Sequence, residues 1–192
     1  YARIPIINGL TDYSHPCQAM ADFLTILEHK GKFEGLKLCY VGDGNNVAHS
    51  LMDAGARLGV NVTVACPKGF EPNLIAFQEA TEAAKATGAK IEVVHSPQEG
   101  VKGADVVYTD VWASMGQEAE AAKRRQIFMP FQVNAELMKH AKDDAIFMHC
   151  LPAHRGDEVT DEVIDAPYSV VFDEAENRLH AQKAIMYQLM KK

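Results

Sequence analysis

The fold is decided by residues 36–58, which read LKLCYVGDGNNVAHSLMDAGARL. Leu36–Val41 is a short, mainly apolar run without strict apolar/polar alternation, which predicts a strand that is covered on both faces. A glycine-rich turn follows, and Asn46–Leu58 then carries apolar residues such as Leu51 and Met52 at helical spacing. A strand, a tight turn and a helix in this order form the first unit of a parallel α/β sheet.

The same alternation of short apolar runs and helical patterns continues along the chain. Strands are also predicted at Ile4–Ile7, Asn61–Ala65, Ile91–Val94, Val106–Thr109, Ala145–His149 and Ser169–Phe172, and helices at Pro16–His29, Asn73–Thr87 and Glu174–Lys191. This pattern predicts an α/β fold, a Rossmann-like open parallel sheet with helices on both faces. Right-handed crossovers place the carboxyl ends of the strands along one edge, where ligands of such folds bind.

The composition excludes several classes of protein. The 192 residues are 47% hydrophobic and 23% charged, as in a globular domain. A formal net charge of −7 disfavours nucleic acid and anionic membranes as partners. No apolar run is long enough to span a bilayer. The four cysteines are far apart and form no C-x-x-C pair, so a cytoplasmic protein without disulfides is expected.

The glycine turn Gly42-Asp43-Gly44-Asn45-Asn46-Val47 invites a dinucleotide interpretation. The G-x-G-x-x-G pattern requires glycine where Val47 stands, and the next strand ends in Ala65-Cys66-Pro67-Lys68 without the acidic residue that would bind a ribose. A nicotinamide cofactor is therefore disfavoured, and no cofactor is expected. A plain turn with an asparagine helix cap explains the segment equally well.

Three further segments combine groups that are suited to chemistry. They are His15-Pro16-Cys17-Gln18 at a helix start, Asp110 with Ser114-Met115-Gly116 after a strand, and His149-Cys150-Leu151-Pro152 after another. Each has an ordinary alternative: a helix cap, hydrogen bonds at the start of a loop, or a buried free cysteine. The histidines are irregularly spaced, so no metal site is expected.

Taken in chain order, the motifs HPCQ (15–18), GDGNN (42–46), D-x-x-x-SMG (110–116), HCLP (149–152) and AENR (175–178) resemble the ornithine carbamoyltransferase family. The resemblance runs from about Ile4 to the C-terminus, and the SMG loop is similar to the ornithine enzymes rather than to relatives that carbamoylate aspartate. It implies transfer of the carbamoyl group of carbamoyl phosphate to the side-chain amine of L-ornithine in arginine biosynthesis. It also implies a cytoplasmic homotrimer, or a multiple of trimers.

The resemblance assigns roles to individual residues. Carbamoyl phosphate is expected to contact His15, Pro16, Cys17, Gln18, Cys150, Leu151 and Arg178. Ornithine is expected to contact Asn46, Asp110, Ser114 and Met115, and the residues at the reacting centre are Cys150, Asp110 and Arg178. The resemblance further implies a cis Leu151–Pro152 bond. The length and polarity of the segment from Trp112 to Arg125 predict a mobile lid over ornithine.

The resemblance also predicts how the chain is divided. Residues 1–18 are expected to end a carbamoyl-phosphate domain and start a linking helix, residues 19–177 to form the ornithine-binding domain, and residues 178–192 to form a helix returning toward the preceding domain. The phosphate cradle of the family, Ser-Thr-Arg-Thr-Arg, does not occur in this sequence, so the chain alone is expected to be inactive. Two alternatives stay open: a carbamoyltransferase for a related amine such as putrescine or N-acetylornithine, and an amino-acid-binding module without chemistry of its own.

Overall fold

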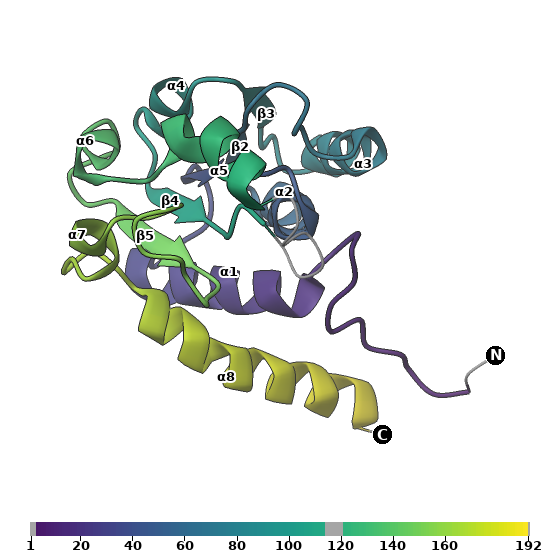
Figure 1. The fold of residues 1–192 in the computed structure, drawn as a ribbon. Helices are drawn as coiled ribbons and strands as arrows, with labels where there is room; N and C mark the ends of the chain where they lie inside the picture. Colours follow the sequence, from purple (N-terminus) through teal and green to yellow (C-terminus); the bar gives the residue numbers. More distant parts are fainter. Residues whose placement is uncertain (1–2, 114–120, 192) are drawn as a thin grey trace.

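The computed structural model describes residues 3–113 and 121–191, which form an open sheet with helices on both sides (Figure 1). The sheet has five parallel strands in the order β3-β2-β1-β4-β5. Their bounds are β1 Lys37–Val41, β2 Asn61–Ala65, β3 Ile91–Val94, β4 Val106–Thr109 and β5 Ile146–His149. The chain order reverses between β1 and β4, and such a switch point is where ligands of open α/β sheets bind.

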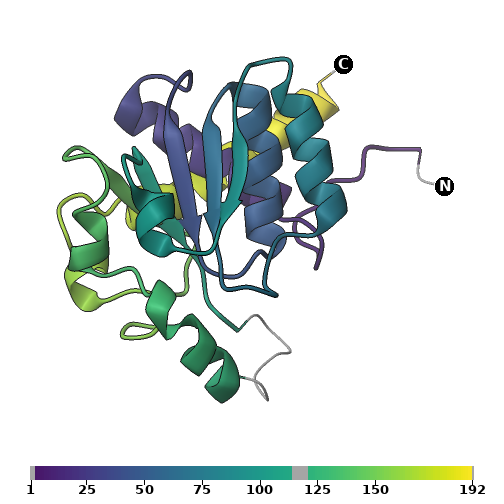
Figure 2. The same ribbon diagram turned by 90° about the horizontal axis from the view of Figure 1, so that it is seen from above.

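Helices cover both faces of the sheet, as the view from above shows (Figure 2). The described helices are α1 Pro16–Lys30, α2 Asn46–Leu58, α3 Leu74–Ala84, α4 Pro97–Val101, α5 Ala121–Phe128, the 3-10 turn η2 Met129–Phe131, α6 Ala135–Met138, α7 Asp161–Ile164 and α8 Val171–Met190. Helices α1, α2 and α3 pack on one face, and α4, α6 and α7 pack on the other. Helix α8 lies along α1 (Figure 1).

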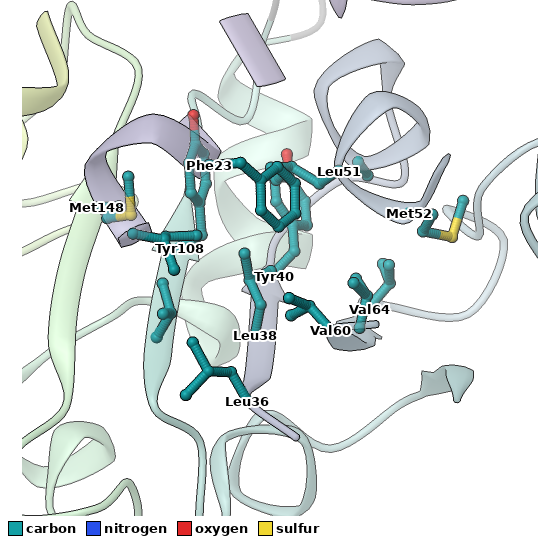
Figure 3. Close-up of a cluster of buried hydrophobic side chains, with 14 of the residues drawn as sticks. Phe23, Leu36, Leu38, Tyr40, Leu51, Met52, Val60, Val64, Tyr108 and Met148 are labelled. Atoms are coloured by element: carbon teal, nitrogen blue, oxygen red, sulfur yellow. The ribbon is translucent and has the colours of Figure 1, made fainter. Parts of the chain in front are cut away.

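Alternate residues of each strand enter two separate apolar layers. Leu38 and Tyr40 of β1 belong to the layer under α1 and α2 (Figure 3), while Cys39 and Val41 belong to the layer on the opposite face. All four are fully buried. A strand that is buried on both faces has no solvent-exposed positions at which polar residues would alternate with apolar ones, which explains the mainly apolar run seen in the sequence.

Local signals account for the two helices that frame the site. Helix α1 begins with Pro16 in its first turn and ends at Gly31, whose φ of 70° lies in the left-handed region. Helix α2 is capped by Asn45, whose side-chain oxygen accepts hydrogen bonds from the backbone of Val47 at 3.0 Å and Ala48 at 3.2 Å. The capping asparagine thereby places the start of α2 at the switch point.

Five of the seven predicted strands are confirmed, and two predictions are wrong. Ile4–Ile7 forms no strand; Ile4 and Ile6 are 72% and 77% exposed, because no neighbouring strand is present among the described residues. Ser169–Phe172 is not a strand either, because α8 begins at Val171 and only Ser169 bridges to Phe147. Val170 and Val171 are buried, and over so few residues an apolar helix turn has the same sequence pattern as a strand.

Across residues 3–113 and 121–191, none of the helices combines the length and the apolar character that crossing a membrane requires.

Candidate functional site

Asp110 is the centre of a polar group at the switch point. It follows β4 directly and is 7% exposed. Its carboxylate accepts hydrogen bonds from the Asn45 amide at 2.9 Å, the Cys150 thiol at 3.2 Å and the backbone N–H of Val111 at 2.8 Å. The carboxyl ends of β1, β4 and β5 thus bring together three segments that are far apart in the sequence.

Among the residues that the structure describes, no cation neutralises this carboxylate. Within the described ranges, no Lys, Arg or His side chain lies within 4.0 Å of it. A buried carboxylate without a partner cation is unfavourable unless a ligand supplies the positive charge. The geometry is therefore suited to an ammonium group.

The Cys150 thiol is a hydrogen-bond donor rather than a nucleophile in this arrangement. Burial raises its pKa well above the usual range, and the negative charge of Asp110 raises it further. The thiol therefore keeps its proton at neutral pH, whereas covalent catalysis by cysteine needs the thiolate.

A second cluster lies at the start of α1. Burial lowers the pKa of His15, and the positive charge of Arg178 lowers it further, so its imidazole is neutral at neutral pH. The guanidinium of Arg178 donates a hydrogen bond to the side-chain oxygen of Gln18. The negative charge of Asp110 acts in the other direction and raises the pKa of His15, so the two clusters belong to one region. A neutral imidazole, an amide and a guanidinium together can bind a carbonyl group and an anion.

Other predicted site residues have clear structural contacts. Cys17 is buried, and its thiol points to the carbonyl of Asn8 at 3.4 Å. The amide of Asn46 donates to the carbonyl of Thr11 at 2.7 Å, whereas its neighbour Asn45 contacts Asp110. Ser114 and Met115 lie outside the described residues, so their predicted role stays a prediction.

The turn after β5 has the predicted backbone. The Leu151–Pro152 bond is cis, which confirms that expectation. The backbone N–H of Leu151 donates to Nδ1 of His149 at 2.9 Å, and Nε2 of His149 lies 3.1 Å from the carboxylate of Glu158. Both ring nitrogens are thus engaged. Although donor atoms of Asp110, His149 and Cys150 lie within 4.8 Å of one another, a metal ion there would have to displace one of these bonds.

The glycine turn packs against its own chain. A Cβ atom at Gly44 would lie 2.2 Å from the backbone nitrogen of Pro72, and the Gly44 N–H donates to the carbonyl of Phe70 at 2.8 Å. Close packing of the chain explains this glycine without a phosphate ligand, which further disfavours a dinucleotide.

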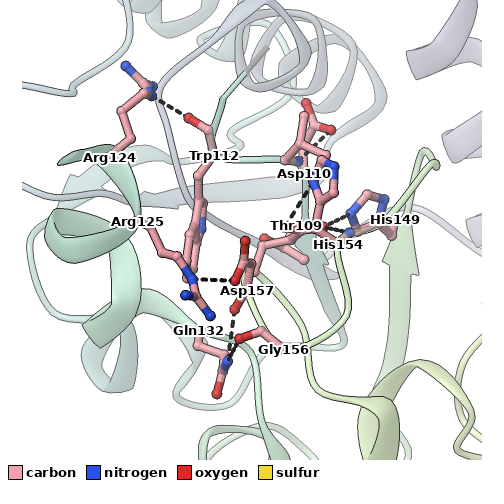
Figure 4. Close-up of polar contacts among 12 residues, drawn as sticks. Thr109, Asp110, Trp112, Arg124, Arg125, Gln132, His149, His154, Gly156 and Asp157 are labelled. Carbon is pink, nitrogen blue, oxygen red and sulfur yellow. Dashed lines mark hydrogen bonds and ion pairs between the residues drawn. The ribbon is translucent and has the colours of Figure 1, made fainter. Parts of the chain in front are cut away.

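The end of the predicted lid is anchored. Arg124 is buried and donates to the carbonyl of Trp112 (Figure 4). It also donates to the carboxylate of Asp43. Its guanidinium also lies 5.1 Å from the ring centre of Phe70, a cation–π contact. Residues 114–120 lie outside the described residues, so the mobility of the lid stays a prediction. The sequence did not indicate this pairing, because Asp43 and Arg124 are distant in the chain.

A large cavity lies away from this edge. It has a volume of about 720 Å³ and lies between α1, α2 and α3. Its lining is mainly apolar, with Phe23 and Phe33 prominent, and includes neither Asp110 nor Arg178. A small charged ligand needs the polar groups of the switch point, so we assign the candidate site by these groups and not by cavity size.

This strand order, with polar side chains gathered at the switch point, is typical of α/β domains that bind small polar ligands. The chain belongs to the aspartate/ornithine carbamoyltransferase family: residues 34–189 match the profile of its Asp/Orn binding domain, and residues 1–28 match that of its carbamoyl-P binding domain.

Individual relatives agree with this assignment. The chain is 67% identical over 190 residues to an ornithine carbamoyltransferase of Thermococcus kodakarensis, covering 99% of this chain and 60% of the relative. The structure of ornithine carbamoyltransferase from Pyrococcus furiosus matches with a TM-score of 0.96 and 63% identity, over 99% of this chain and 61% of that one. The structure of ornithine carbamoyltransferase from Gloeobacter violaceus matches with a TM-score of 0.93 and 51% identity, over 100% of this chain and 64% of that one. The chain thus spans about 60% of the length of the curated relatives that it matches.

Proposed function

We propose that this chain is the ornithine-binding part of an ornithine carbamoyltransferase, which converts L-ornithine and carbamoyl phosphate to L-citrulline and phosphate. The observation that carries the proposal is the buried carboxylate of Asp110, which has no cation partner among the described residues. The α-ammonium group of ornithine would supply that charge. The names of the relatives at 60–67% identity support the same reaction.

In the proposed reaction, the neutral side-chain amine of ornithine attacks the carbonyl carbon of carbamoyl phosphate. A C–N bond forms, the bond from carbon to the phosphate oxygen breaks, and the nitrogen loses a proton. No redox change occurs, so the protein has to supply orientation and positive charge. Asn46, Asp110, Ser114 and Met115 would hold the amino-acid end of ornithine.

The carbamoyl group would bind at the start of α1. His15 and Gln18 offer a neutral imidazole and an amide, and Arg178 offers a positive charge beside them. Pro16, Cys17, Cys150 and Leu151 would complete the contact surface. A single guanidinium neutralises a departing phosphate only in part, and the Ser-Thr-Arg-Thr-Arg motif is not in this sequence.

The division of the chain follows from the same proposal. Residues 1–18 would end the carbamoyl-phosphate domain, residues 19–177 would bind ornithine, and residues 178–192 would return to the preceding domain. We further propose a homotrimer, or a multiple of trimers, in the cytoplasm, where the four free thiols would remain reduced. A role in arginine biosynthesis is supported by the Pyrococcus furiosus relative, which is named anabolic.

The electrostatics of the site favour ornithine over one related amine. N-acetylornithine has no α-ammonium group, so the buried carboxylate of Asp110 would keep its unpaired charge in that complex. Putrescine has ammonium groups but no carboxylate, and the SMG loop expected to bind that carboxylate lies outside the described residues. An amine panel with ornithine, N-acetylornithine and putrescine separates these substrates.

The test of the proposal is citrulline formation. We expect no measurable turnover by this chain alone, because loss of one preorganised donor typically lowers a rate by about 10²–10³ and several are missing. Adding the preceding, carbamoyl-phosphate-binding portion of the Thermococcus kodakarensis relative should restore turnover; we call this mixture the reconstituted enzyme. Turnover by the chain alone near that of the reconstituted enzyme would contradict the proposal, and so would a reconstituted enzyme that carbamoylates another amine in preference to ornithine.

A further inference from the structure

A pair of acidic side chains is buried between α1 and α8, next to the proposed carbamoyl-phosphate site. Asp22 and Glu174 are both 0% exposed. The hydroxyl of Tyr108 lies between them, 3.3 Å from the carboxyl of Asp22 and 3.0 Å from that of Glu174. No Lys or Arg side chain of the described residues forms an ion pair with either acid. Two adjacent buried carboxyls cannot both carry a charge without a large cost in free energy, so they share a proton.

We assign the shared proton from the hydrogen bonds that Gln18 makes. Tyr108 has one hydroxyl hydrogen, so it can donate to one acid and accept from the other. The amide of Gln18 donates to Asp22 at 2.8 Å but lies 3.4 Å from Glu174, which marks Asp22 as the better acceptor. With the proton assigned to Glu174, Glu174 donates to the Tyr108 hydroxyl, and Tyr108 donates to ionised Asp22.

The surroundings of the pair support this assignment. Burial, the largest cause, raises the pKa of Glu174 well above its usual range and that of Asp22 to about 7. Arg178 on α8 lies nearby, and its positive charge stabilises the ionised form of Asp22. Glu174 also accepts the backbone N–H of His149 at 2.9 Å, so the pair contacts the last residue of β5, directly before Cys150.

We infer that Asp22 and Glu174 are positioning residues that fix the amide of Gln18 with its oxygen toward Arg178 and the carbamoyl group. The inference rests on the proposed function and goes beyond it, because neither acid reaches the substrate. An ionised carboxylate only accepts hydrogen bonds, so the NH₂ group of Gln18 has to face Asp22. The oxygen then faces the site, where Arg178 uses one lone pair and a second remains for a carbamoyl N–H.

This arrangement solves a problem that is specific to amides. The two ends of a glutamine amide have nearly the same shape, and a glutamine without fixed partners presents either its oxygen or its NH₂ group. If Gln18 turned over, its NH₂ group would face the guanidinium of Arg178 and the NH₂ group of the substrate. In both contacts two hydrogen-bond donors would then face each other, and neither hydrogen bond could form.

The test is a set of kinetic measurements on the reconstituted enzyme. Asp22→Asn keeps the shape but lets a donor face Gln18, so the KM for carbamoyl phosphate should rise about tenfold or more, with the KM for ornithine changed less than threefold. Tyr108→Phe, which keeps the ring and removes the shared hydroxyl, should shift the same KM in the same direction. Glu174→Gln retains a neutral donor toward Tyr108 and should raise it less than Asp22→Asn does.

The matched control is Thr25→Val. Thr25 lies on the same face of α1 and accepts a hydrogen bond from Asn177 of α8 at 3.0 Å, but it does not contact Gln18. Its replacement should lower stability without a selective effect on the KM for carbamoyl phosphate. An unchanged KM for carbamoyl phosphate in both Tyr108→Phe and Asp22→Asn would overturn the inference, as would an equal rise in Thr25→Val. If Asp22→Asn does not fold, Tyr108→Phe alone decides. If the reconstituted enzyme without any substitution has no activity on ornithine, the proposed function itself is contradicted.

Discussion

Strand β4 is flanked by two buried aspartates, Asp105 and Asp110, whose surroundings differ. Asp105 is 4% exposed; it accepts the Lys142 ammonium at 2.7 Å and the backbone N–H of Lys37 at 2.9 Å. Asp110 is 7% exposed and accepts only neutral donors among the described residues. The charge at the amino end of the strand is thus compensated within the fold, while the charge at the carboxyl end has no cation partner among the described residues. This difference is the one expected between a structural residue and the binding residue that we propose at Asp110.

The largest expected effect is on ornithine binding. Asp110→Asn keeps the shape of the side chain but removes the charge, and a hydrogen bond to a charged group contributes about 1.5–3 kcal/mol. The dissociation constant for ornithine should therefore rise by roughly 10- to 100-fold, as measured by calorimetry on the reconstituted enzyme, while that for carbamoyl phosphate changes less than threefold. Equal losses for the two substrates would show that Asp110 has a structural role.

Asp105→Asn should lower the stability of the fold and leave ornithine binding almost unchanged. It removes a compensated charge that holds Lys37 and Lys142, so the free energy of unfolding should fall. The expected loss is about 1–2 kcal/mol, less than the full value for a charged hydrogen bond because Lys142 is half exposed. Urea denaturation measures the change. Ornithine affinity should stay within twofold; a large loss would mean that the two aspartates are not distinct in function.

The smallest effect concerns the thiol next to Asp110. Because burial and then the Asp110 charge raise the pKa of Cys150, the thiolate fraction at pH 8 is low and increases as the pH rises. Asp110→Asn removes the second cause, so alkylation of Cys150 by iodoacetamide should become about two- to fivefold faster at fixed pH. Mass spectrometry identifies the modified cysteine, and Cys150→Ala serves as the control. An unchanged rate would indicate that a cation already neutralises Asp110.

Much of the fold could be predicted because its signals are local. Asn46–Leu58 matches α2 at both ends, since an asparagine cap precedes it and a glycine follows it. The five sheet strands were predicted within a residue of their bounds because apolar runs between turns are specific enough when each strand is buried on both faces. Ile4–Ile7 was wrongly predicted because it has no neighbouring strand among the described residues, and pairing is not a local property. Ser169–Phe172 was wrongly predicted because only Ser169 bridges to β5 before α8 begins at Val171.

The site was predictable only in outline. Its motifs could be placed after the correct strands, and Asp110 and Cys150 do meet. Asn45 was overlooked as a partner of Asp110, although it is adjacent to the predicted Asn46, because one residue of difference at a helix cap turns a side chain in another direction. The Asp22–Glu174 pair was also missed, since 152 positions separate the two acids and neither lies in a recognisable motif.

The amino-acid sequence by itself determined where β4 begins and ends, and that an aspartate stands on each side of it. It could not determine which aspartate is neutralised. That was decided by the tertiary structure, because Lys142 reaches Asp105 from the segment before β5 whereas Asp110 meets Asn45 and Cys150 at the switch point. Hydrophobic periodicity is a local property of the sequence. The electrostatic environment of a charge instead depends on every group within a few ångströms, and folding brings those groups together from distant positions in the chain.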